Sequence, residues 1–165
     1  MASEKGIMRK AFMTSEMVLS HYRIDESGLT ACLKNVVGTG VYESNYPKNK
    51  IGEVRIAPFD VQFSDEDILQ PDLLFIKNEK LNLVRNKGLF GAPDLVIEVL
   101  SPSTSYLDYQ EKKVIYEKFG VQEYFIVDPN TKSVSSFFLK NKEYQEQETA
   151  ETIIKSIVLN TDIVF

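Results

Sequence analysis

The chain has 165 residues, of which 43% are hydrophobic and 26% charged, and these values are typical of one globular domain covering residues 1–165. The single cysteine, Cys32, excludes an internal disulfide and a multi-cysteine zinc site, and the single histidine, His21, argues against a histidine-rich metal centre. The formal net charge of −5 predicts no overall attraction to nucleic acid, although it leaves a local basic groove open.

The composition also bears on where the protein works. No apolar run reaches the length of about 18 residues that a membrane helix needs, so we expect no membrane span. Residues 1–12 are too polar and interrupted for a secretory signal. The lone cysteine favours a reducing, cytoplasmic setting.

The first fifty residues give no clear succession of elements, but strand patterns begin at residue 53. Residues 53–63 alternate apolar and polar side chains around Pro58, and residues 70–77 form a short apolar run with a proline at its entry. Residues 78–91 indicate a polar connection with one helical turn.

The second half predicts the main elements. Residues 95–100 are rich in β-branched side chains and predict a central strand. Residues 107–120 predict an amphipathic helix that ends at Gly120, with a core-facing stripe made of Leu107, Val114, Ile115 and Phe119. Residues 122–128 and 133–140 predict a hairpin, and residues 143–165 are expected to add edge structure. This order predicts an α/β (α+β) fold, with a mixed β-sheet flanked by helices and a C-terminal β-hairpin.

Glu98 is an acidic residue in the middle of the most apolar predicted strand. Burial of a carboxylate without a partner costs several kcal/mol, so a cation must lie close to it or its pKa must rise. One interpretation is an internal ion pair with a lysine or arginine. The other is a metal site: if the strand that follows Asp72 is a neighbour, Asp72 and Glu98 converge, and Asp60 could join them from a third strand.

The predicted helix carries a second polar set. Asp108, Lys112 and Tyr116 are spaced four residues apart and therefore share roughly one helical face. An exposed Asp–Lys pair is the simplest interpretation. Because the helix follows the Glu98 strand after a short loop, Lys112 is also expected to reach the carboxyl end of that strand, where α/β sheets bind ligands.

These residues resemble a known group of enzymes. An Asp at a strand start, a Glu on the next strand and a nearby Lys are similar to the PD-(D/E)XK nuclease superfamily. Residues 51–139, with "PDLVIEVLSPST", the Asp-x3-Lys-x3-Tyr helix and "GVQEYFIVDP" in order, more closely resemble the Uma-two family of restriction-endonuclease-like proteins. The resemblance implies a restriction-endonuclease-like core.

The resemblance also implies roles for individual residues. Asp72 and Glu98 would bind Mg²⁺ or Mn²⁺, with the main-chain carbonyl of Val99 as a third ligand. The superfamily usually has a lysine two positions after the acidic residue, and Leu100 fills that position here. Lys112 would take over its role and stabilise charge on the phosphate. Asp94, Ser101, Asp108 and Tyr116 match the family pattern; Asp94 is expected to cap the strand entrance and Asp108 to hold Lys112.

One family feature is not assigned by the sequence. Members usually carry an acidic residue on a first helix that completes the metal site. The candidates in this chain are Glu16, Asp25, Glu26 and Glu43, and the sequence does not choose among them.

The remaining candidates concern partners. Lys77, Lys80, Arg85 and Lys87 form a local basic stretch that could contact phosphates, with a solvated loop as the default interpretation. Tyr124, Phe125, Phe137 and Phe138 are interpreted as core packing. The leading hypothesis is a metal-dependent endonuclease that hydrolyses DNA, and relatives suggest a homodimer. The alternatives are a catalytically inactive nucleic-acid-binding or scaffold protein, and a site that is only an ion pair between Glu98 and Lys112.

Overall fold

The computed structural model describes residues 51–85, 88–101 and 105–165. Its centre is a mixed sheet in the order β1-β4-β7-β8-β9-β10, with β11 also paired to β9. The strands of this central sheet are β1 (Gly52–Ile56), β4 (Leu73–Lys77), β7 (Leu95–Val99), β8 (Glu123–Val127), β9 (Ser133–Lys140), β10 (Glu143–Glu146) and β11 (Ala150–Glu151). Among the described strands of this central sheet, β7 and β8 form the parallel pair, because the helical segment between them returns the chain to the same end of the sheet.

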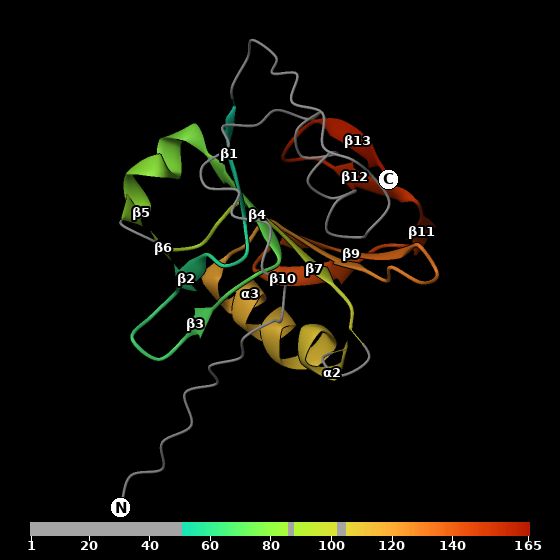
Figure 1. Ribbon diagram of the computed structural model, residues 1–165, viewed down its shortest axis with the longest axis horizontal. Helices are drawn as coiled ribbons and strands as arrows, with labels where there is room; N and C mark the ends of the chain where they lie inside the picture. The colour runs from blue at the N-terminus through green and yellow to red at the C-terminus, as the bar shows by residue number, and fades with distance from the viewer. Residues whose placement is uncertain (1–50, 86–87, 102–104) are drawn as a thin grey trace, which may run out of the picture.

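The helical segment has three consecutive parts: α2 (Ser105–Leu107), a π-helical turn η2 (Asp108–Lys112), and α3 (Lys113–Phe119). It ends as the sequence predicts, because Gly120 adopts the left-handed conformation with φ of 83° that residues with a side chain rarely take. The segment covers one face of the central sheet (Figure 1). Tyr116 and Val121 pack there against Leu74, Val96 and Ile126.

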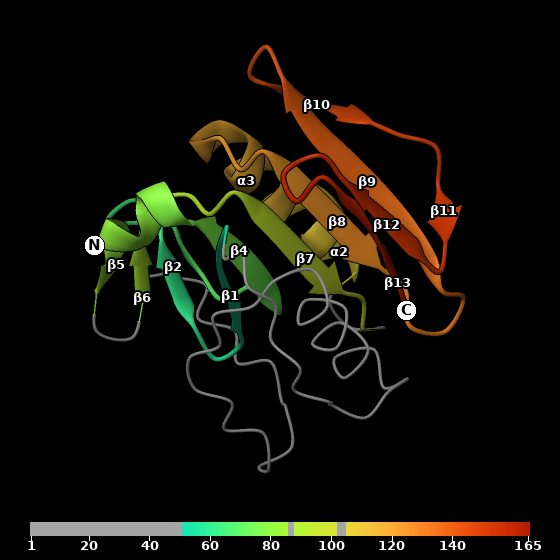
Figure 2. The ribbon, with the colours of Figure 1, turned by 90° about the horizontal axis from the view of Figure 1, so that it is seen from above.

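The opposite face is covered by the C-terminal hairpin of β12 (Ile153–Ser156) and β13 (Thr161–Val164). Ile154, Leu159 and Ile163 pack against Phe75, Ile97 and other apolar residues of the central sheet. Figures 1 and 2 show the hairpin and the helical segment on the two sides of this sheet. The mixed sheet, the flanking helix and the C-terminal hairpin confirm the predicted fold class.

A second, smaller sheet has the order β3-β2-β6-β5. Its strands are β2 (Asp60–Gln62), β3 (Ile68–Leu69), β5 (Val84–Arg85) and β6 (Gly88–Phe90), and a 3-10 helix, η1 (Asn78–Leu83), precedes β5. The helical turn expected within residues 78–91 is therefore present. The two strands in this stretch were not predicted, because each is only two or three residues long.

The prediction that Val114 belongs to the core is wrong. Val114 is 64% exposed, whereas Asp108 and Tyr116 are buried. The helical segment thus presents to the sheet the stripe that looked polar in the sequence, and its apolar Val114 faces away. No helix in the described part of the chain is long and apolar enough to cross a membrane.

Candidate active site

Asp72 and Glu98 lie opposite each other on adjacent antiparallel strands. Leu73 of β4 pairs with Ile97 of β7, so Asp72, one residue before β4, is in register with Glu98. Residues opposite each other in such a pair project from the same face of the sheet. The Asp72 N–H points to Glu98 Oε2 at 3.4 Å, and Asp72 Oδ2 accepts the Val99 N–H at 2.8 Å. The predicted neighbourhood of the two carboxylates is thus present in the fold.

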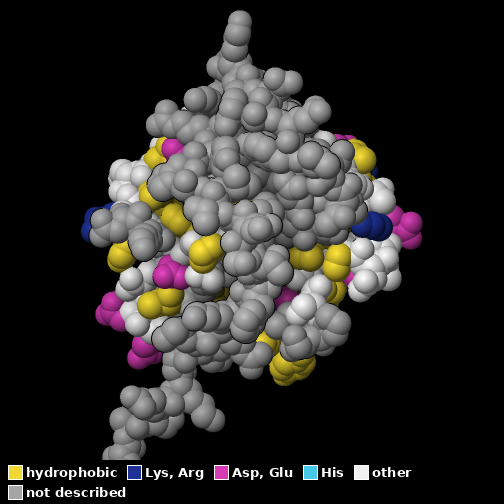
Figure 3. Space-filling model, in the orientation of Figure 1, with side chains coloured by type: hydrophobic (Ala, Val, Ile, Leu, Met, Phe, Trp, Pro, Cys, Tyr) yellow, Lys and Arg dark blue, Asp and Glu magenta, His cyan; other side chains and the backbone are white. Residues whose placement is uncertain are grey.

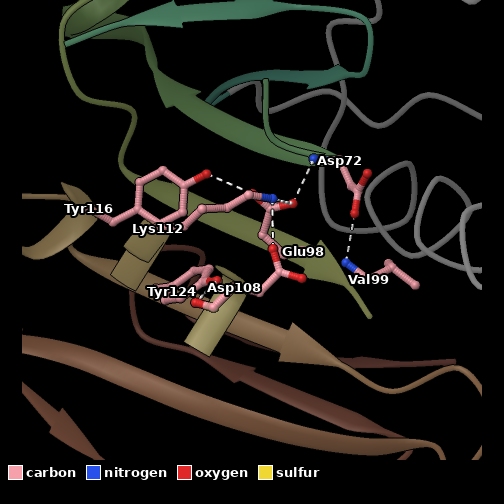
Figure 4. A network of polar contacts seen from close by, with 7 residues as sticks. All are labelled: Asp72, Glu98, Val99, Asp108, Lys112, Tyr116 and Tyr124. Atoms are coloured by element: carbon pink, nitrogen blue, oxygen red, sulfur yellow. Dashed lines mark hydrogen bonds and ion pairs between the residues drawn. The ribbon is translucent and has the colours of Figure 1, made fainter. Parts of the chain in front are cut away.

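Glu98 is buried and has partners on both carboxylate oxygens (Figure 4). The Tyr116 hydroxyl donates to Oε1 at 2.7 Å, and the Lys112 ammonium lies 2.9 Å from Oε2. Both partners come from the helical segment that covers this face. The sequence-based expectation that this segment brings Lys112 to the Glu98 strand agrees with this arrangement.

Lys112 is shared between two carboxylates. Besides Glu98, its ammonium contacts Asp108 Oδ1 at 2.7 Å, and Asp108 is buried, not exposed as the simplest interpretation held. Asp108 and Lys112 are the first and last residues of the π-helical turn. Figure 4 shows Lys112 reaching between the Glu98 and Asp108 carboxyl groups. Asp108 therefore holds Lys112 beside Glu98.

Burial governs the electrostatics of the cluster. It raises the pKa of Glu98 to about 8, and the nearby Asp72 and Asp108 carboxylates add to this effect while Lys112 opposes it. Burial likewise raises the pKa of Asp72. Burial alone would lower the pKa of Lys112, but Glu98 and Asp108 outweigh it and raise that pKa. A further cation close to Asp72 and Glu98 would therefore stabilise the ionised forms of both carboxyl groups.

The donor chemistry of this place fits a divalent metal. Carboxylate oxygens are the ligands that Mg²⁺ and Mn²⁺ prefer, and here one carboxylate lies directly before β4 and the other in the adjacent strand β7. Asp72 and Glu98 are the side chains that would hold the ion. Across residues 51–85, 88–101 and 105–165, no three Asp, Glu, His or Cys side chains converge as a preformed metal cluster. The Val99 carbonyl stays a predicted ligand.

Two predicted acidic residues lie elsewhere. Asp60 starts β2 in the smaller sheet, where it is exposed and accepts a hydrogen bond from Gln70 at 2.9 Å. Asp94 is buried at the other end of β7 from Glu98, where it accepts the Lys77 N–H at 2.8 Å and pairs with Lys80 at 3.0 Å. Asp94 thus lies directly before β7, with its side chain bonded to the end of β4, and the structure does not bring Asp60 to the cluster.

The predicted phosphate-contacting residues do not gather at the carboxylates. Lys77 ends β4, a strand length away from Asp72, and Lys80 is engaged by Asp94. Arg85 lies over the Phe90 ring in the smaller sheet, 5.7 Å from its centroid. Lys87 and the first-helix candidates Glu16, Asp25, Glu26 and Glu43 lie outside the described residues. On the face shown in Figure 3, the described Lys and Arg side chains that can be seen lie at the two margins.

Sequence reasoning missed one residue that belongs to this network. Tyr124 of β8 was interpreted as core packing, yet its hydroxyl donates to the main-chain carbonyl of Asp108 at 2.9 Å. An aromatic residue in a buried strand gives no sequence signal of such a bond. Only the strand order, which places β8 under the π-helical turn, shows it.

Comparisons with known proteins agree with this fold. The family model described as "Uma2: Putative restriction endonuclease" matches residues 39–163. A solved structure described as "a putative nuclease belonging to DUF820 from Anabaena variabilis" aligns with a TM-score of 0.57 and 16% identity, over 82% of this chain and 71% of that one. At this identity the likeness shows the fold alone. No curated protein matches the chain.

Proposed function

The chain belongs to the Uma2 family of restriction-endonuclease-like proteins, and on this premise we propose that it is a metal-dependent endonuclease hydrolysing DNA phosphodiester bonds. The family and the nuclease-like fold support nuclease function. One observation carries the finer proposal: Asp72 and Glu98 face each other on adjacent strands, with the Lys112 ammonium 2.9 Å from Glu98.

Each residue of the cluster has a distinct part in this proposal. A bound Mg²⁺ or Mn²⁺ ion would polarise a phosphate oxygen and supply hydroxide from water. Asp72 and Glu98 present the oxygen ligands, and the Tyr116 hydroxyl fixes the orientation of the Glu98 carboxyl group. Lys112, held by Asp108, presents a positive charge beside them that stabilises the charge developing on the phosphate.

Cleavage of supercoiled plasmid in Mg²⁺ or Mn²⁺ tests the proposal. Lys112→Ala should lower the rate by a factor on the order of 10² to 10³, the usual effect of losing a group that stabilises transition-state charge. Lys113→Ala is the matched control, because the Lys113 ammonium lies over the Phe137 ring, 4.1 Å from its centroid, and takes no part in the cluster. Cleavage that persists unchanged in Lys112→Ala would contradict the proposal and point to a contaminant or another site.

A second candidate is favoured by the same ion pairs. Lys112 contacts both Glu98 and Asp108, and Leu100, partly buried against the helix-side core, stands in the usual lysine position. The cluster would then be a structural ion-pair network in a catalytically inactive nucleic-acid-binding or scaffold protein. Calorimetric titration with Mn²⁺ separates the two: the enzyme binds the ion and loses it in Glu98→Ala but not in Asp60→Ala, whereas the inactive protein binds no ion at this place.

A further inference from the structure

The π-helical turn aligns the side chains of the helical segment with the sheet. In an uninterrupted α-helix, residues eight positions apart drift by about 80° around the axis. The turn Asp108–Lys112 takes up an additional residue and offsets this drift, so Asp108 and Tyr116 are both buried on the sheet side. Lys112, between them, reaches Glu98 for the same reason. What stabilises this turn therefore decides where Lys112 lies.

A hydroxyl from the sheet holds the first carbonyl of the turn. Tyr124 of β8 is fully buried, and its hydroxyl donates to the Asp108 carbonyl at 2.9 Å. A carbonyl has two lone pairs, so it can accept this bond and still accept a main-chain N–H. The Tyr124 ring is fixed between Tyr116, at a centroid distance of 4.9 Å, and Phe137, at 5.8 Å. The donor is thus rigidly placed under the turn.

We propose that Tyr124 is a positioning residue of the site: by holding the Asp108 carbonyl it fixes the π-helical turn and, through it, the place of Lys112 beside Glu98. The importance of that place for DNA cleavage rests on the function proposed above. The role of Tyr124 in placing Lys112 does not depend on that function, because it concerns only the main chain of the turn and the ion pairs of Lys112. Tyr124 touches neither carboxylate in this scheme and acts through the helix alone.

The same cluster of aromatic residues contains a matched control. The Tyr144 hydroxyl donates to the main-chain carbonyl of Val121 at 2.9 Å, and its ring lies 6.3 Å from that of Tyr124. Tyr144→Phe therefore removes the same kind of hydrogen bond from the same packed region, but at Val121, two residues beyond the end of α3, and not at the π-helical turn. A purely structural role for Tyr124 predicts that the two Phe variants behave alike.

The test uses the metal-free protein without DNA. The rate at which an amine-acylating reagent modifies Lys112 is measured by peptide mass spectrometry, with Lys113 in the same peptide as the internal reference, and amide hydrogen exchange is followed over residues 105–119. In Tyr124→Phe the Lys112-to-Lys113 ratio should rise roughly two- to tenfold, the factor that corresponds to losing one hydrogen bond, and exchange at residues 109–113 should accelerate. In Tyr144→Phe both should stay at the wild-type values.

Equal labelling ratios in the two variants would overturn the proposal. Because no metal, DNA or turnover enters the experiment, failure of the nuclease function leaves this result unaffected, and the two hypotheses fail separately. If Tyr124→Phe does not fold, exchange in the wild-type protein decides: residues 109–113 should exchange as slowly as strand β8, and exchange as fast as that of the exposed turn after β9 would overturn the proposal.

Discussion

Glu98 is held by three donors: the Tyr116 hydroxyl, the Lys112 ammonium and the Asp72 N–H. They leave the carboxyl group a single orientation, although burial makes its ionised form costly and raises its pKa to about 8. A carboxyl group with a fixed orientation and a strongly raised pKa is typical of a site that binds a cation or a reactant. Tyr116 is the neutral side chain among these donors, and its contribution is therefore the simplest to measure by substitution.

Tyr116→Phe should lower the free energy of unfolding by about 1–3 kcal/mol, because it leaves a buried carboxylate oxygen without its hydroxyl donor while preserving the ring packing. Urea denaturation measures this loss. Tyr109→Phe is the control, since the Tyr109 hydroxyl bonds the Ser135 hydroxyl, at 2.9 Å, on a partly exposed surface. A Tyr116→Phe protein no less stable than Tyr109→Phe would show that the bond to Glu98 is energetically unimportant.

The C-terminal hairpin is fastened to the central sheet by a second buried carboxylate, that of Glu123 in β8. It accepts the Ser156 hydroxyl at 2.5 Å and the N–H groups of Ile157 and Val158 at 2.6 and 2.8 Å. These three donors belong to the end of β12 and the turn that follows it. Burial raises the pKa of Glu123 even though each of these hydrogen bonds lowers it.

This shift predicts the sign of a pH dependence. Because the folded protein binds the Glu123 proton more tightly than the unfolded chain, this group's contribution to the free energy of unfolding is complete below the usual pKa of 4.5 and declines as the pH rises through the folded-state pKa. In urea denaturation from pH 4 to pH 8, the stability of the wild type relative to Glu123→Gln should therefore decrease with pH. Glu143→Gln, at an exposed position in β10, controls for the change in net charge. A relative stability that rises with pH would contradict this account of the hairpin.

At the level of the whole molecule, the core strands were predictable because runs of β-branched and aromatic residues favour buried strands. Residues 95–100 and 122–128 carry long β-branched and aromatic runs, and Asp72 at the entry of a third run implied that it could meet Glu98. The Asp-x3-Lys-x3-Tyr spacing likewise indicated one polar face. The pairing of β4 with β7 and the helical segment that packs on them bring these residues together in the observed cluster.

The burial of the helix residues and the sheet to which Asp60 belongs could not be predicted from the sequence, because both depend on contacts between distant segments. Val114 was assigned to the core because its type is apolar, whereas the π-helical turn, which has no sequence signature, directs Asp108 and Tyr116 to the sheet. Asp60 follows a strand in the sequence but belongs to a different sheet, and only pairing partners reveal this. The metal, the DNA substrate and the homodimer stay predictions.

The central claim is that Asp72 and Glu98 hold a divalent metal ion, and a crystal soaked in Mn²⁺ tests it most directly. The account predicts an anomalous density peak within coordination distance of both carboxyl groups, and its loss in a Glu98→Ala crystal soaked in the same way. A soaked wild-type crystal without a peak between Asp72 and Glu98, or with Mn²⁺ bound only at exposed carboxylates such as Asp60, would contradict it.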